Sequence, residues 1–215
     1  MRVVDRKKAR PFVLGIGGGP ASGKSTVARL LARRGARVVD ADRIGHQILT
    51  RPRVKQSLVE VFGKHILDNS GRISRPRLAE EVFGNPDKLE RLDRIVHPPL
   101  LDEIRAQVDR LKREDDVLMV VVDAALLIEW NLHSELCNAV VFVDAPVDVR
   151  RRRAVCGRQM RPEQFDKRAQ AQLPQETQRQ QADYLLDNTA SLAQLEQEVE
   201  RLWNAILTES SPTAT

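Results

Sequence analysis

The sequence predicts an α/β protein in which a parallel β-sheet of about five strands lies between helices. Three observations lead to this prediction. A glycine-rich motif near the N-terminus separates an apolar segment from an amphipathic one. Two later apolar segments, rich in valine, read as buried strands, and each carries an acidic residue near its end. Amphipathic segments separate these runs, and such alternation is typical of a sheet that helices cover on both faces.

The glycine-rich motif lies in residues 12–26, FVLGIGGGPASGKST. The apolar start predicts a buried strand, and Gly18, Gly23, Lys24 and Ser25 follow at the GxxxxGKS spacing of a phosphate-binding loop. In such a loop the backbone N–H groups surround phosphate oxygens, the lysine reaches the β- and γ-phosphates, and the hydroxyl binds Mg²⁺. A glycine-rich turn with an incidental lysine is the alternative. The predicted strand before the motif and the predicted helix after it favour a nucleoside triphosphate.

Composition limits the class of protein. The chain has 215 residues, enough for one α/β domain with insertions, and a net charge of +5. The arginines are spread along the chain and aromatic residues make up only 4%, so the charge suits polyphosphate ligands as well as nucleic acid. The N-terminal apolar run is too short for a signal peptide or a membrane span, which predicts a cytoplasmic protein. Cys137 and Cys156 form no CxxC pair and are expected as free thiols.

Two aspartates follow the second predicted strand. Val38 and Val39 predict a short strand one crossover helix after the first, so the two should be parallel and end side by side. Ligands of open α/β sheets bind at that edge. Asp40 and Asp42 are expected there in an extended segment, and one of them is a candidate general base beside a γ-phosphate. Alternatively, Asp40 caps the next helix and Asp42 is a solvated turn residue.

Residues 52–115 have no strand signal. Apolar residues recur at spacings of three and four between turn-forming breaks, which predicts a mainly helical insertion. An insertion beside a phosphate loop commonly forms the acceptor side of a kinase cleft, by analogy of fold. Arg75 precedes one of these helices. His97 stands before Pro98 and Pro99, where a histidine is either a helix terminator or a ligand.

The clearest strand is in residues 117–129, VLMVVVDAALLIE, and it ends in Asp123. A near-continuous apolar run is expected for a central parallel strand. An acid at its end commonly holds Mg²⁺ behind a phosphate loop, and a loop aspartate that caps the next helix is the alternative. Residues 139–146, AVVFVDAP, predict a further buried strand.

An arginine-rich helix–loop–helix follows, with Arg150 to Arg153, Arg158, Arg161 and Arg168. Such a charge run is a solvated face, an RNA-facing patch or, in a phosphoryl-transfer enzyme, a lid that closes over the triphosphate. Residues 182–188 predict a last short strand, and residues 191–207 predict an amphipathic helix packed on the sheet.

These elements divide the chain into four kinds of region. They are a nucleotide-binding core (12–51, 116–146 and 183–207), a helical acceptor-binding region (52–115), a lid (147–182) and flexible termini (1–11 and 208–215). The number of copies in an assembly has no signature in the sequence.

From Phe12 to about Leu207 the chain resembles the dephospho-CoA kinase family. The matching pieces are FVLGIGGGPASGKST, VVDADRIGHQIL, the FG at Phe62 and Gly63, GRISRPRLAEEVF, IVHPPL, VVVDAALLIE, VFVDAP and ADYLLDN. The resemblance implies a P-loop kinase-like fold with a helical acceptor-binding insertion and a helical lid. It also implies transfer of the γ-phosphoryl group of ATP, with Mg²⁺, to the ribose 3′-hydroxyl of dephospho-CoA, the last step of CoA synthesis.

The resemblance implies residue roles as well. Asp42 matches the acid held to be the base for the 3′-hydroxyl, and Arg75 and His97 match acceptor-site positions. Arg153, Arg168 and Gln172 fall in register with the lid, Arg168 as a substrate-binding residue. Ser25 and Asp123 are the metal-ligand candidates, and Lys24 acts in catalysis. The expected ATP-binding residues are Gly19, Pro20, Ala21, Ser22, Gly23, Lys24, Ser25, Thr26 and Arg153.

Three positions depart from the family pattern. Ala21 stands where a further loop glycine is usual, and alanine fits only if that residue needs no positive φ. Ala125 replaces a proline. Gly157 occupies the position of a catalytic arginine, so we expect the neighbouring Arg158 to take that role.

Two other functions stay open. The loop GGPASGKST also resembles that of uridine kinases, which favours another small-molecule kinase. The basic segment and the pI of about 9.5 favour a nucleotide-dependent RNA-binding protein.

Overall fold

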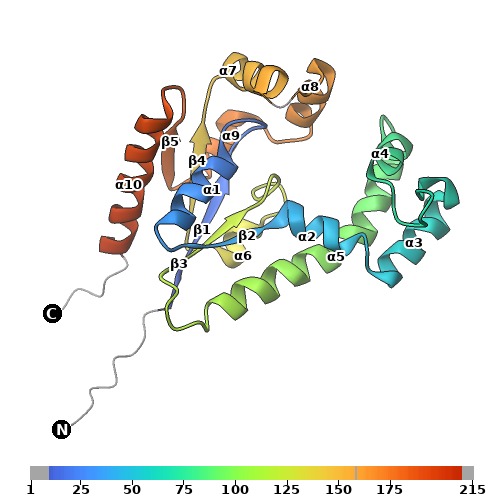
Figure 1. Ribbon diagram of the computed structural model, residues 1–215, viewed down its shortest axis with the longest axis horizontal. Coiled ribbons are helices and arrows are strands. Elements are labelled where there is room, and N and C mark those ends of the chain that lie inside the picture. The colour runs from blue at the N-terminus through green and yellow to red at the C-terminus, as the bar shows by residue number, and fades with distance from the viewer. Residues whose placement is uncertain (1–9, 158, 210–215) are drawn as a thin grey trace, which may run out of the picture. The chain divides into compact units, whose positions relative to one another are not determined.

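The computed structural model describes residues 10–157 and 159–209. Within them, the predicted α/β fold is confirmed: five parallel strands form one sheet in the order β2-β3-β1-β4-β5 (Figure 1). The strands are β1 Phe12–Gly17, β2 Arg37–Asp40, β3 Met119–Asp123, β4 Ala139–Asp144 and β5 Tyr184–Asp187. All strands therefore end at the same edge of the sheet.

The two N-terminal strands are not neighbours, so the prediction that they end side by side is wrong. β3 lies between them and pairs Ile16 with Asp123 on one side and Asp40 with Asp123 on the other. The physical reason is burial. The residues of β3 before Asp123 are all buried and need a partner strand on both edges, whereas β2 has an exposed Arg37 and suits the edge of the sheet.

The chain forms two compact units. The first contains the described residues up to Asp40 and from Val108 on, and the second is Ala41–Gln107. Besides the sheet, the first unit contains α1 Lys24–Arg33, α6 Leu132–Leu136, α7 Val147–Arg152, the π-helix η2 Arg153–Gly157, α8 Pro162–Gln170, α9 Gln175–Gln180 and α10 Leu192–Glu209. The basic helix–loop–helix and the final helix are thus confirmed, and α9 is an element that the sequence analysis did not identify.

One face of the sheet is covered by α1 and α10, which lie next to each other (Figure 1). Five residues of α10 recur at three and four spacing and are buried: Leu195, Val199, Leu202, Trp203 and Ile206. They meet Val27 and Leu31 of α1 in the main hydrophobic core. Because α1 starts at the glycine-rich motif, this core fixes the helix whose N-terminus faces the motif.

The second unit is helical, as predicted. It contains α2 Ala41–Ile48, α3 Pro52–Phe62, the 3₁₀ helix η1 Lys64–Ile66, α4 Arg75–Val82 and α5 Pro86–Leu111, whose last residues belong to the first unit. One of the turn-forming breaks, residues 68–71 (DNSG), is a turn organised by Asp68. Its carboxylate accepts hydrogen bonds from the N–H groups of Ser70 and Arg72 at 2.9 and 3.0 Å. The hydroxyl and N–H bonds to this carboxylate lower the pKa of Asp68 to about 2.

The helix α5 runs through Pro98 and Pro99 without ending. The interpretation of His97 as a helix terminator is therefore wrong. Each proline removes one helical N–H donor, but Leu100 and Ile104, which follow at helical spacing, are buried and hold the second half of α5 in the same helix.

The structure also bears on membrane-spanning helices and on the state of the two cysteines. In the part of the chain that the structure covers, no helix combines the length and apolarity that crossing a bilayer requires. Cys137 and Cys156 are free thiols, and burial raises the pKa of Cys137 to about 12, so this thiol stays protonated at neutral pH.

Two Gly→Ala substitutions test the packing with opposite expected signs. A Cβ on Gly15 of β1 would lie 2.6 Å from Cδ2 of the buried Leu127 and 3.0 Å from Sγ of Cys137, so G15A should lower the free energy of unfolding by about 1–3 kcal/mol. A Cβ on Gly45 of α2 meets nothing within 4 Å, so G45A should raise it by about 0.5–1 kcal/mol. Urea denaturation measures both. Equal stability of G15A and the wild-type protein would contradict the packing described for β1.

Candidate active site

The phosphate loop, residues 18–23, connects β1 to α1 and needs glycine at both ends. Gly18 and Gly23 have φ of 138° and 108°, a region that residues with a side chain rarely adopt. A Cβ on Gly18 would lie 2.7 Å from the backbone oxygen of Val143, and one on Gly23 would lie 2.1 Å from Nδ2 of Asn188. The two glycines of the motif are therefore required by the backbone and by its neighbours.

The N-terminus of α1 is suited to an anion. Gly23 is its N-cap residue and no side chain caps the helix, so the first N–H groups and the positive end of the helix dipole face the loop. Lys24 lies over the loop, where its ammonium donates to the carbonyl oxygens of Gly18 and Gly19, the latter at 3.0 Å. Ser25 is exposed at the start of the helix. Backbone donors, a lysine and a hydroxyl thus come together in the first unit.

Alanine was expected to fit at position 21 only if this residue needs no positive φ, and that condition is not met, because the φ of Ala21 is 57°. The N–H of Ser22 donates to the carbonyl oxygen of Gly19 at 3.2 Å, which closes a four-residue turn with Pro20 and Ala21 in the middle. Proline at the second position and positive φ at the third are features of a type II turn. Pro20 fits the second position of such a turn, and the positive φ of Ala21 costs an alanine about 1 kcal/mol or more.

Asn188 holds the loop from the other side, and the sequence analysis gave it no role. Its side chain is buried, and Nδ2 donates to the carbonyl oxygen of Ser22 at 2.6 Å. Its own N–H donates to the carbonyl oxygen of Asp144 at 2.8 Å, which fixes it at the end of the sheet. The sequence carries no signal for this role, because only the folded chain brings the end of β5 to the loop.

A cavity of about 230 Å³ adjoins the loop. Its polar side is formed by the loop and the start of α1, and its apolar side by leucines of α10; the lining residues are Ala21, Gly23, Thr26, Arg153, Asn188, Ala190, Leu192 and Leu195. Nη1 of Arg153 is buried and has no hydrogen-bond partner within the described residues. A pocket that is basic at one end and apolar at the other suits an anionic ligand with an aromatic part, such as a nucleotide.

Two carboxylates lie near the loop at the edge of the sheet. Asp123 is in register with Asp40 on one side and with Ile16, near the end of β1, on the other. Within the described residues no group of three or more acidic, histidine or cysteine side chains forms a metal cage. Magnesium is usually held by one or two protein ligands and by substrate phosphates, so the hydroxyl of Ser25 and the carboxylate of Asp123 fit Mg²⁺ in chemical type.

Three predicted site residues belong to the second unit. Asp42 is exposed in the first turn of α2, which begins directly after β2, so the predicted extended segment around Asp42 is wrong. A carboxylate in a first helical turn is favoured by the helix dipole, which explains the early turn into a helix. Arg75 is the exposed first residue of α4, and His97 is half-buried in α5.

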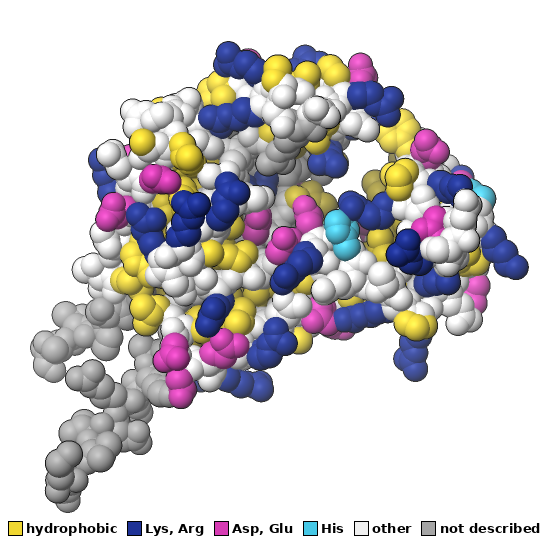
Figure 2. Space-filling view, in the orientation of Figure 1, with side chains coloured by type: hydrophobic (Ala, Val, Ile, Leu, Met, Phe, Trp, Pro, Cys, Tyr) yellow, Lys and Arg dark blue, Asp and Glu magenta, His cyan; other side chains and the backbone are white. Residues whose placement is uncertain are grey.

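The basic segment, residues 147–182, belongs to the first unit. Figure 2 shows lysine and arginine side chains gathered over α7 and α8, and Arg168 is exposed on α8. The predicted catalytic Arg158 lies outside the described residues, and the space around Gly157 is open.

The turn between α8 and α9 in the basic segment is hydrogen-bonded to the loop after β3. Gln172 donates through Nε2 to the carbonyl oxygen of Ala125, and the N–H of Leu173 donates to Oε1 of Glu129 at 2.9 Å. Glu129 is the last residue of the VVVDAALLIE segment, and its spacing indicated no role. Its carboxylate accepts a backbone N–H where the basic segment leaves α8, so it anchors that segment.

Comparison with known proteins gives matches over most of the chain. Residues 12–194 match the family model described as dephospho-CoA kinase. A dephospho-CoA kinase from Corynebacterium diphtheriae is 37% identical over 199 residues, which are 92% of this chain and 98% of that protein. The crystal structure of TT1252 from Thermus thermophilus is 32% identical, with a TM-score of 0.77 over 94% of this chain and 99% of that one. A dephospho-CoA kinase structure from Campylobacter jejuni, 24% identical with a TM-score of 0.63 over 90% and 96% of the two chains, matches in fold.

The conformation of Ala21 leads to a stability prediction. Because glycine adopts φ of 57° without the steric cost, A21G should raise the free energy of unfolding by about 0.5–1 kcal/mol. The same change at Ala79, an exposed position inside α4, should lower it by about 1 kcal/mol. Denaturation without nucleotide measures both changes, and a loss of stability in A21G would show that Ala21 is not strained.

Proposed function

Since the chain belongs to the dephospho-CoA kinase family, we propose that it transfers the γ-phosphoryl group of ATP to the ribose 3′-hydroxyl of dephospho-CoA, giving CoA and ADP. The observation that carries this proposal is the phosphate loop, whose glycines, lysine and helix N-terminus converge beside a cavity of about 230 Å³. The cytoplasm is its proposed location.

ATP occupies the loop and the adjoining cavity in this proposal. The phosphates lie against the backbone of residues 19–26, where Lys24 leaves the loop carbonyls and reaches the β- and γ-phosphates. Arg153, whose Nη1 lacks a hydrogen-bond partner among the described residues, binds the nucleotide from the cavity wall. The leucines of α10 flank the base.

Ser25 and Asp123 are the proposed residues for Mg²⁺. The ion would neutralise charge on the β- and γ-phosphate oxygens. Ser25 offers its hydroxyl from the first turn of α1, and Asp123 offers its carboxylate from the neighbouring strand. The role of the chain is to place these two oxygens at the edge where β1 opens into the loop.

Asp42 is the proposed base for the 3′-hydroxyl. It stands two residues after Asp40. Asp40 is the last residue of β2, and β2 ends at the edge of the sheet where the phosphate loop begins. A base acts by orienting the hydroxyl and accepting its proton as the phosphoryl group is transferred in line. The second unit, with Arg75 and His97, is the proposed acceptor-binding region.

The basic segment is the proposed lid. Its arginines would close over the triphosphate, exclude water and stabilise the charge of the transferring group, with Arg168 also contacting the acceptor and Arg158 acting in catalysis. The hydrogen bond from the N–H of Leu173 to Glu129 supports a lid that is anchored between α8 and α9.

An acceptor panel tests the function. ADP release is measured with ATP, Mg²⁺ and either dephospho-CoA, uridine or no acceptor, and the CoA product is identified by mass spectrometry. The expected result is ADP release with dephospho-CoA as acceptor and none with uridine or without an acceptor. Turnover with uridine instead would favour the other kinase, and salt-sensitive RNA binding without phosphoryl transfer would favour an RNA-binding protein.

The base assignment leads to a kinetic prediction. D42N should lower kcat by about 10²–10⁴-fold and leave ATP affinity nearly unchanged, because the base acts only in the transition state. D87N is the matched control, since Asp87 is also an exposed aspartate in the first turn of a helix of the second unit, and its kcat should stay near that of the wild-type protein. K24M should lower both kcat and ATP affinity. A normal kcat in D42N would mean that another group is the base.

A further inference from the structure

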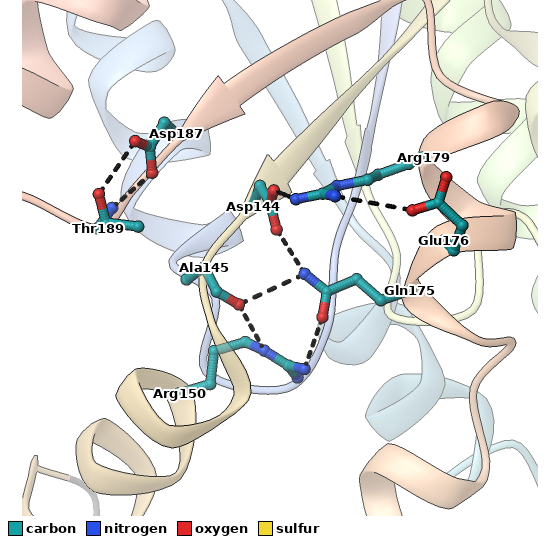
Figure 3. Close-up of polar contacts among 8 residues, drawn as sticks. All are labelled: Asp144, Ala145, Arg150, Gln175, Glu176, Arg179, Asp187 and Thr189. Atoms are coloured by element: carbon teal, nitrogen blue, oxygen red, sulfur yellow. Dashed lines mark hydrogen bonds and ion pairs between the residues drawn. The ribbon is translucent and has the colours of Figure 1, made fainter.

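Arg150 is a buried cation under the phosphate loop. This residue of α7 is only 5% exposed, and its Nε donates to the carbonyl oxygen of Ala145 at 3.0 Å while Nη2 donates to Oε1 of Gln175 at 3.0 Å (Figure 3). The ring of Phe165 lies 5.8 Å from the guanidinium. Among the described residues, the hydrogen bonds of this guanidinium go to neutral oxygens, and its burial lowers the pKa of Arg150.

The guanidinium also packs directly against the phosphate loop. Its Nη1 lies 3.5 Å from the carbonyl oxygen of Pro20, and a Cβ built on Gly19 would lie 2.1 Å from the same nitrogen. This approach is possible only because Gly19 has no side chain. Arg150 therefore contacts the arm of the loop that precedes the strained Ala21, and Asn188 contacts the arm that follows it.

The contacts of Arg150 lead on to the end of the sheet and to α9. Gln175, which accepts from Arg150, also donates to the carboxylate of Asp144 at the end of β4, and Arg179 forms an ion pair with that carboxylate (Figure 3). The two arms of the loop are thus joined to the same strand end, since Asn188 also donates to the backbone of Asp144. A strained backbone such as that of Ala21 persists only where its surroundings hold it.

We propose that Arg150 is a positioning residue for ATP: it fixes the Gly19–Pro20 arm of the phosphate loop against β4 and α9, in the conformation that directs the loop N–H groups at the phosphates. This inference rests on the proposed binding of ATP to the loop. A buried, hydrogen-bonded guanidinium is costly to desolvate, and glutamine or a hydrophobic residue would fill the same space at lower cost. Arg150 suits the position because one rigid fork reaches three oxygens on three different segments.

The test separates ATP binding from acceptor binding. R150Q should raise the KM for ATP about tenfold, which corresponds to about 1.4 kcal/mol, with the KM for dephospho-CoA within about twofold of the wild-type value. R150K keeps the charge but loses the fork, so it should recover only part of the ATP affinity. R201Q is the control, because it removes one arginine charge from the surface of α10 and should change neither KM.

A double-mutant cycle tests the contact itself. G19A in the wild-type background forces a methyl group onto the guanidinium and should raise the dissociation constant for ATP about tenfold or more, whereas G19A added to R150Q should weaken binding less than about threefold further. ATP binding is measured by calorimetry and folding by circular dichroism. Equal effects of G19A in both backgrounds would overturn the contact.

Further results would overturn the positioning role. These are an unchanged ATP affinity in a folded R150Q, or equal increases in the two KM values together with a lowered melting temperature, which would indicate a structural role only. If R150Q does not fold, R150K and G19A carry the test, and normal ATP binding in both contradicts the proposal. Absence of turnover with dephospho-CoA in the wild-type protein contradicts the proposed acceptor alone, because calorimetry reads ATP binding independently.

Discussion

The phosphate loop depends on close approaches that only glycine permits. Gly18 touches the backbone of β4, Gly19 touches the guanidinium of Arg150, and Gly23 touches the amide of Asn188. All three neighbours come from the C-terminal half of the chain, more than a hundred residues from the motif. A motif that looks local in the sequence therefore takes its shape from β4, α7 and the end of β5.

Charged groups of both signs lie near this loop. Lys24, Arg150 and Arg153 lie on or beside it together with the N-terminus of α1, whereas Asp123 ends the neighbouring strand β3 and Asp40 ends β2, the next strand of the sheet. A triphosphate with a divalent cation carries the complementary arrangement, since its oxygens suit the positive groups and its metal suits the carboxylates. In the proposed function, this arrangement would suit a metal–nucleotide complex rather than either component alone.

Much of the fold could be predicted from the sequence, because burial on both faces gives central parallel strands an unmistakable run of apolar residues, as in 119–122. The order of the strands could not, since periodicity identifies a strand but not its neighbour. The continuation of α5 through Pro98 and Pro99 was missed because the buried residues after the prolines outweigh two lost donors.

The candidate site shows the same division. The spacing of Gly18, Gly23 and Lys24 located the loop, but the positive φ of Ala21 could not be predicted, because a proline at the second turn position suits type I and type II turns alike. The supporting residues Arg150, Asn188 and Glu129 could not be given their roles, because each acts through a contact made by the folded chain. Arg150 in particular stands in a run of arginines, where a solvated face is the ordinary interpretation.

The position of β3 between β1 and β2 affects when the sheet can form while the chain is being synthesised. When the first forty residues leave the ribosome, both of their strands lack the neighbour they share, which is encoded some eighty residues later. The helical second unit leaves the ribosome before β3 and can form its local contacts at that stage. The apolar side chains of β1 still lack the strand that covers one edge of β1. The sheet of the first unit can therefore be completed only late in translation, when β3 and the strands after it have been made.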